Sequence, residues 1–142
     1  MPSWCKNTLT IAGPEDERLR WKEFHGTEEG ELTFSACLPR PKELEEVDGE
    51  ALLDWGRKHW GTGWGPSLST WTDAREVWFQ TAWSPPVPWL KTMAKQWPQL
   101  GFHLAFQMEY DECRPHSISI KDGDQVTLWD AETASASPKG EC

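Results

Sequence analysis

Apolar and polar residues alternate in four short segments of the chain, as they do in strands that bury one face of a sheet. The longest run covers residues 102–110, where Phe102 and Leu104 alternate with polar or small residues. Two apolar pairs further along the chain flank Asp122-Gly123, a dipeptide typical of tight hairpin turns. We therefore predict strands at residues 6–12, 31–38, 77–83 and 102–110, followed by a C-terminal hairpin.

Apolar residues at helical spacing separate these strands. Residues 14–26 begin with a proline and three acidic side chains, which suit the first turn of a helix, and Leu19 and Phe24 are its predicted inward side chains. A second helix is predicted at residues 48–61, with Asp48 as its N-cap. The clearest helix is predicted at residues 88–97, with apolar residues at Leu90, Met93, Ala94 and Trp97.

The order of these elements is that of an α+β, ferredoxin-like sandwich. We expect a four-stranded antiparallel sheet with two packed helices, beginning near Pro14 and Pro88, on one face. A helical, tryptophan-rich insert lies between the second and third predicted strands. Residues 1–130 form a single domain in this interpretation, and the small, polar residues 131–142 form a disordered tail. The shared core face is predicted to hold Leu9, Ile11, Phe34, Phe79, Leu104 and Phe106.

The charge balance restricts the class of partner. The 142 residues include 14 Lys and Arg against 23 Asp and Glu, which gives a formal net charge of −9 at pH 7. Affinity for nucleic acid comes largely from Lys and Arg contacts to phosphates, so this balance favours a protein partner with a basic surface over nucleic acid. No segment approaches the ~18 consecutive apolar residues of a membrane helix, and no membrane association is expected.

Cysteine usage indicates the compartment and the metal content. The four cysteines are widely spaced, form no CxxC pair and follow no apolar leader. We therefore interpret them as reduced thiols and the protein as cytoplasmic. Cys113 and His116 have the spacing of a metal-ligand pair, but a structural zinc site needs a second pair, so no metal or other cofactor is expected.

Two segments resemble catalytic or cofactor motifs only superficially. Gly61-x-Gly63-x-Gly65 has Pro66 where a dinucleotide loop needs a glycine, and it lacks the preceding strand and the following helix. Ser84 lacks the Gly-x-Ser-x-Gly elbow, and the two prolines after it offer no backbone N–H groups for an oxyanion hole. We therefore expect no catalytic residues and a protein that is not an enzyme.

Tryptophan is the strongest signal in the sequence. The chain has 11 tryptophans and one tyrosine, which is a large number of rings for one small core, so some are expected at the surface. The rings between residues 60 and 83 either form a local buried core, onto which Trp64 packs, or leave one or two rings to contact a partner. The acidic connection at residues 43–54 is the other predicted contact surface. The candidate partner-binding residues are Trp60, Trp64, Trp71, Trp78, Trp83, Glu45, Glu46 and Asp48.

The outward face of the predicted sheet provides an alternative function. Ferredoxin-like sheets can bind single-stranded RNA by stacking bases on exposed aromatic side chains. Only Trp78 is a good stacking platform on this face, and no Lys or Arg is expected there, so binding should be weak and unspecific. The face is predicted to carry Thr8, Thr10, Thr33, Ser35, Trp78, Gln80, His103 and Gln107.

Three motifs occur in order along the chain: Met1-Pro2-Ser3-Trp4-Cys5-Lys6-Asn7-Thr8-Leu9-Thr10-Ile11, Trp60-Gly61-Thr62-Gly63-Trp64 and Thr81-Ala82-Trp83-Ser84-Pro85-Pro86. Together they resemble the YubB-like family of ferredoxin-like domains. The resemblance implies the fold and an origin in bacterial plasmids and phages, and it implies no activity or site residues. Beyond Tyr110 the chain departs from the glycine-rich continuation of that family.

Composition and resemblance together give a functional hypothesis. We expect a non-enzymatic, acidic interaction protein of a mobile genetic element that binds a host or element-encoded protein. A counter-defence, anti-CRISPR-like inhibitor is one concrete form, because acidic phage proteins can occupy basic nucleic-acid channels by charge complementarity. The alternative is a single-stranded nucleic-acid-binding module that uses the sheet face.

Overall fold

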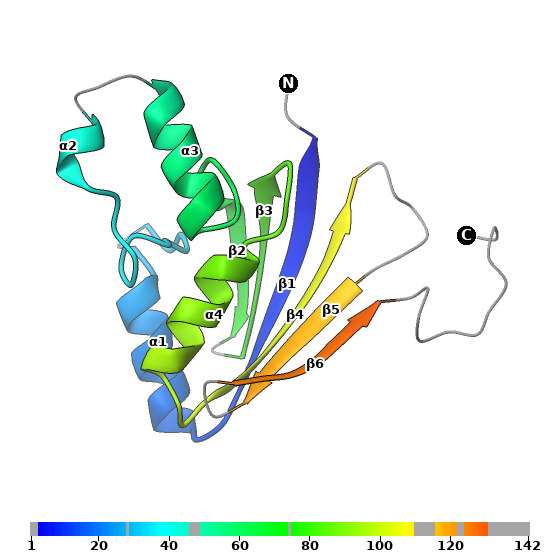
Figure 1. The fold of residues 1–142 in the computed structure, drawn as a ribbon. Coiled ribbons are helices and arrows are strands. Elements are labelled where there is room, and N and C mark those ends of the chain that lie inside the picture. Colours follow the sequence, from blue (N-terminus) through cyan, green and yellow to red (C-terminus); the bar gives the residue numbers. More distant parts are fainter. Residues whose placement is uncertain are drawn as a thin grey trace, which may run out of the picture.

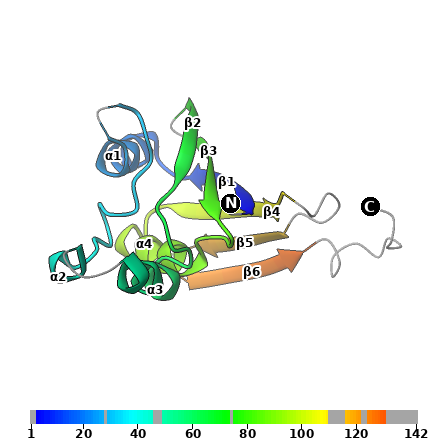
Figure 2. The ribbon, with the colours of Figure 1, turned by 90° about the horizontal axis from the view of Figure 1, so that it is seen from above.

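The computed structural model describes residues 3–27, 29–45, 49–73, 75–109, 116–121 and 124–130. An antiparallel sheet forms one layer, and the helices lie together on one of its faces (Figures 1 and 2). The elements in chain order are β1 (Trp4–Ala12), α1 (Glu15–His25), α2 (Lys42–Glu45), α3 (Gly49–His59), β2 (Ser67–Asp73), β3 (Glu76–Ala82), α4 (Val87–Gln96), β4 (Gly101–Met108), β5 (His116–Lys121) and β6 (Asp124–Asp130).

The sheet has the strand order β2-β3-β1-β4-β5-β6. The first four strands in this order, with α1 after β1 and α4 after β3, have the connectivity of a ferredoxin-like domain. In the part of the chain that the structure describes, the sheet has six strands rather than the predicted four, because the predicted C-terminal hairpin pairs with β4 and extends the sheet. The helical insert, α2 and α3, follows α1 directly.

The prediction of a second strand at residues 31–38 is wrong. Only Leu32 forms an isolated bridge, to Gly26, and the residues after it form a turn in which the Leu38 N–H donates to the Phe34 carbonyl (3.1 Å). The apolar residues of this segment are buried nonetheless, Leu32 at 3% and Phe34 at 1% exposure. Its alternating pattern therefore reflects side chains that reach the core from an irregular loop.

The strand that occupies this place in the topology is β2, in a segment that begins with the Gly, Pro and Ser residues typical of a loop. It pairs with β3 at the edge of the sheet, and its register shifts twice, between Ser67 and Thr70 and between Trp71 and Asp73. An edge strand with irregular register needs no continuous apolar face, so its sequence shows a weak strand signal.

The core lies between the sheet and the helices. Of the six residues predicted to share it, Leu9, Ile11, Phe34, Phe79 and Leu104 are buried in one cluster, and the sixth, Phe106, is partly buried against it. The predicted inward face of α1 is wrong: Leu19 and Phe24 are 51% and 48% exposed, whereas Trp21 and His25 are buried. These two residues are one helical turn apart, so α1 contacts the core through a single narrow stripe. Within the described part of the chain, no helix has the length and apolar character to span a membrane.

Candidate aromatic contact site

The loop after α3, residues 60–66, is held in place by three hydrogen bonds to two other segments, residues 38–40 and the end of β3. The Thr62 hydroxyl donates to the Ala82 carbonyl (2.8 Å), and the Arg40 guanidinium donates to the Gly63 carbonyl (2.9 Å). The Trp60 indole N–H donates to the carbonyl of Leu38 (2.9 Å). These contacts fix both the backbone of the loop and the ring at its beginning.

Two glycines allow the loop to approach its neighbours closely. A Cβ atom at Gly56, in α3, would lie 2.7 Å from the carbonyl oxygens of both Thr62 and Gly63. Gly61 has a φ of 91°, and a Cβ there would overlap the ring of Pro88. The Trp60-Gly61-Thr62-Gly63-Trp64 motif is therefore explained by packing rather than by phosphate binding.

The turn after β3 meets this loop from the other side. Strand β3 ends at Ala82, and the next residue, Trp83, has a φ of 67°, in the left-handed region that bulky side chains rarely adopt. The Trp83 N–H donates to the Ser3 carbonyl (2.7 Å), and the Ser84 hydroxyl donates to the Gly61 carbonyl. Such a conformation costs on the order of 1–3 kcal/mol and persists only where surrounding contacts enforce it.

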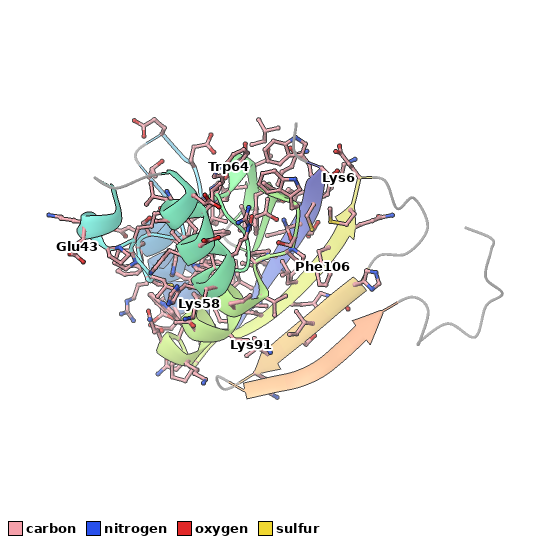
Figure 3. The ribbon with its side chains drawn as sticks, turned by 45° about the horizontal axis from the view of Figure 1, so that its top comes forward. Lys6, Glu43, Lys58, Trp64, Lys91 and Phe106 are labelled. Atoms are coloured by element: carbon pink, nitrogen blue, oxygen red, sulfur yellow. The ribbon has the colours of Figure 1, made fainter. Side chains whose placement is uncertain are left out.

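The two segments present a pair of exposed rings. The ring centroids of Trp64 and Trp83 are 5.0 Å apart with an interplanar angle of 49°, and the residues are 41% and 43% exposed. Figure 3 shows Trp64 beside α3, at the same end of the molecule as Lys6. The expectation that Trp64 packs down into a buried core is wrong, because the loop hydrogen-bonds through its backbone and directs this ring toward Trp83 and solvent. We call these two rings the Trp64–Trp83 pair.

The other three candidate tryptophans have different roles. Trp60 is a core residue at 3% exposure, and the Arg40 guanidinium lies 4.6 Å from its ring centroid. Trp71 is partly buried and donates its indole N–H to the Gly30 carbonyl (2.9 Å). Trp78 is 55% exposed on the sheet face opposite the helices. The five rings therefore do not form one cluster.

Of the three acidic candidates, the structure describes only the backbone of Glu45. Glu45 is the last residue of α2, and Glu46 and Asp48 lie outside the described residues. The same holds for Cys113 of the possible metal pair, whereas His116 stacks on Phe106 with ring centroids 5.6 Å apart. Within the described residues, no group of three or more His, Cys, Asp or Glu side chains is arranged to hold a metal ion.

The motifs quoted from the sequence converge at this site. In the first motif, the Ser3 carbonyl accepts a hydrogen bond from the Trp83 N–H. The second and third motifs are joined by hydrogen bonds from the Thr62 and Ser84 hydroxyls. The tryptophan content of the sequence indicated the aromatic loop but not the outward turn of Trp83. The signal for that turn is Trp83-Ser84-Pro85-Pro86 directly after a strand, because the two prolines must end the strand pairing.

Three titratable groups among the described residues have strongly altered pKa values, and burial is the main cause in each case. Burial raises the pKa of the Cys5 and Cys37 thiols to about 11, against the smaller opposing effect of polar neighbours. Burial lowers the pKa of His25 to about 4. These two thiols stay protonated near neutral pH, which makes them poor nucleophiles and metal ligands.

The strand order, the two covering helices and the antiparallel pairing define a ferredoxin-like α+β domain. The chain belongs to the family described as the ferredoxin-like domain in Api92-like protein, whose model matches residues 59–137, more than half of the 142 residues. The match begins at the loop that carries Trp64 and includes the turn at Trp83. Comparisons with curated proteins and with solved structures give no match.

Proposed function

We propose that this protein is a non-enzymatic interaction module that binds a partner protein through the Trp64–Trp83 pair. The observation that carries the proposal is the combination of two exposed, contacting indole rings with a backbone that is fixed beneath them. Tryptophan is the residue type most enriched among those that dominate protein binding energy.

The fixed backbone matters because ordering the contact residues on binding usually costs free energy. Hydrogen bonds from Thr62 and Arg40 hold the loop, and the Trp83 N–H is bonded to Ser3 before any partner arrives. Each side chain that must be immobilised on binding costs roughly 0.5–1.5 kcal/mol, and a preorganised pair avoids part of that loss. Strain at Trp83 is consistent with a contact role, since strained residues persist where structure enforces them and cluster at functional sites.

The chemistry of the partner follows from charge. With a formal net charge of −9, the chain attracts a basic protein surface and repels an acidic one. We propose a partner that is host-encoded or encoded by the same phage or plasmid, in the cytoplasm of a bacterium. A counter-defence role, in which the acidic protein occupies a basic nucleic-acid channel, is the concrete form of this proposal. The low reactivity expected of the Cys5 and Cys37 thiols supports a role without covalent chemistry.

The test is capture of a partner by matched single-ring variants. Trp64→Ala and Trp83→Gly each remove one ring of the pair, and Trp78→Ala removes a ring of similar exposure from the open sheet face. Circular dichroism confirms folding of each variant, and nuclease treatment of the lysate removes bridging by nucleic acid. We expect the first two variants to lose a partner that the third retains. Equal capture by all three would contradict the proposal.

A second candidate function, single-stranded nucleic-acid binding, is favoured by one correction to the predicted sheet face. Thr33 and Ser35 are not in the sheet, and Lys6, which was not expected on this face, is exposed there beside a 250 Å³ hollow that includes Trp78. Glu76 opposes this function, because its carboxylate accepts the Trp78 indole N–H (2.9 Å) and would repel a phosphate. Fluorescence anisotropy with a single-stranded oligonucleotide tests it: salt-sensitive binding lost in Trp78→Ala would place this function first.

A further inference from the structure

A separate hollow lies on the open sheet face, toward the end of β1 remote from the Trp64–Trp83 pair. It has a volume of about 460 Å³. Its floor forms where two small residues, Ala12 and Gly101, are paired in register across β1 and β4. Gly101 carries no side chain at all, so the hollow exists because this position on the open face is empty. Such a volume is in the range of small-molecule sites.

Hydrogen-bond donors surround this floor. Thr10 on β1, His103 on β4 and Ser119 and Lys121 on β5 line the hollow, and the described residues that line it include no carboxylate. Lys121 gives this lining a positive charge in a chain with a net charge of −9, and Glu76, the register partner of Thr10 on β3, is not part of the lining. A donor-lined site of this kind favours an anion.

The His103–Ser119 contact strengthens the preference of the hollow for an anion. The His103 Nδ1 and the Ser119 hydroxyl oxygen are 2.7 Å apart. If the hydroxyl donates to Nδ1, the ring keeps its N–H at Nε2 for a ligand; if Nδ1 donates, the hydroxyl hydrogen is available instead. In both tautomers the pair uses one of its donors internally and leaves another available.

We propose that this hollow binds a small phosphate-bearing ligand of about mononucleotide size. A phosphate offers more acceptor oxygens than a carboxylate, and Lys121, Thr10 and the His103–Ser119 pair line the same hollow as its possible donors. The hollow is larger than a phosphate ion needs, which leaves room for an organic group over Ala12 and Gly101. This site is distinct from the Trp64–Trp83 pair, and its test is independent of the partner protein.

Gly101→Val is the sharpest test variant. The Cβ of a residue at this position would lie 3.7 Å from the Ile120 carbonyl and 4.0 Å from the Ala12 Cβ, which is ordinary contact, so the strand accepts a side chain. Valine also suits a strand better than glycine, so this variant should melt at or above the wild-type temperature. Lys121→Gln removes the charge without filling the hollow. Trp78→Ala, outside the hollow, is the matched control.

The probes are 5′-AMP, inorganic phosphate, adenosine and a single-stranded oligonucleotide, titrated while amide chemical shifts are recorded by NMR. We expect 5′-AMP to shift the amides of Gly101 and Ser119, and Gly101→Val and Lys121→Gln each to weaken this binding at least about tenfold. Phosphate binding as tightly as 5′-AMP also supports the site, with free phosphate as its source. Retention of 5′-AMP binding in Gly101→Val would overturn the proposal, as would adenosine binding as well as 5′-AMP.

Two further outcomes would also overturn it. One is the absence of localised shifts at millimolar 5′-AMP. The other is oligonucleotide binding that is tighter than 5′-AMP binding and is lost in Trp78→Ala, because the phosphate would then belong to a strand that crosses the whole sheet face.

Discussion

His25 should make the protein sensitive to mild acid. Its side chain is fully buried at 0% exposure, stacked on Trp21 at 4.3 Å and in contact with the rings of Phe24, Trp89 and Trp97. The Nδ1 atom lies 3.0 Å from the Trp21 carbonyl, and Nε2 has no hydrogen-bond partner. An imidazolium at this position would place a charge among apolar rings, so folding keeps the ring neutral.

The size of the effect follows from the pKa difference. Burial lowers the His25 pKa from 6.5 to about 4, so between these values the unfolded chain binds more protons than the folded chain. The stability contributed by the neutral ring is therefore fully present above pH 6.5 and is lost as the pH falls through 4. At about 1.4 kcal/mol per pKa unit, the free energy of unfolding should fall by about 2 kcal/mol between pH 7 and pH 5, and by about 3 kcal/mol at pH 4.

Urea unfolding followed by tryptophan fluorescence at a series of pH values measures this loss. His25→Phe is the control, since it keeps an aromatic ring against Trp21, removes the unpartnered Nε2 atom and cannot titrate. Subtracting the two profiles removes the contribution of the carboxylates that both proteins share. A difference that stays flat from pH 7 to pH 4 would refute the reasoning, because it would mean that the His25 ring is hydrated or protonated in the folded state.

The remaining predictions concern the site and its support, and denaturant unfolding at pH 7 measures each of them. Trp60→Ala, at a core ring, should lower the free energy of unfolding by about 3–5 kcal/mol, whereas Trp64→Ala should lower it by less than about 1 kcal/mol. Gly61→Ala should be more destabilising than Gly30→Ala, because both glycines have positive φ but only Gly61 is packed against a proline ring; equal losses would contradict this explanation. Trp83→Gly should be more stable than Trp83→Ala by about 1 kcal/mol, since glycine tolerates the left-handed backbone, and the reverse order would show that the backbone relaxes in the variants.

Local periodicity was sufficient for much of the fold. Apolar residues alternate with polar ones in β1, β3 and β4 and occur at helical spacing in α4, because each element buries one face. The element order then led to the ferredoxin-like class. The second strand was misplaced because Leu32 and Phe34 alternate as they would in a strand, although they reach the core from a loop. Which of two competing segments pairs with β3 depends on contacts that are distant in sequence.

The site was predictable only in part, for a related reason. Composition pointed to the segment from Trp60 to Trp83, but burial of a ring depends on backbone geometry that residue type does not specify. Strand alternation would place Trp83 on the same face as Phe79, and a φ of 67° turns the backbone at that point. The hydrogen bonds that enforce this turn come from segments far away in the sequence.

The most direct measurement of the central claim is the dissociation constant of the captured partner for wild-type protein, for the Trp64→Ala/Trp83→Gly double variant and for Trp78→Ala. Isothermal titration calorimetry with purified proteins provides all three values under one salt condition. Loss of two central rings should weaken binding by at least about 30-fold, which corresponds to about 2 kcal/mol, while Trp78→Ala stays within about twofold of wild type. A folded double variant that binds as tightly as wild type would contradict the assignment of the Trp64–Trp83 pair as the contact site.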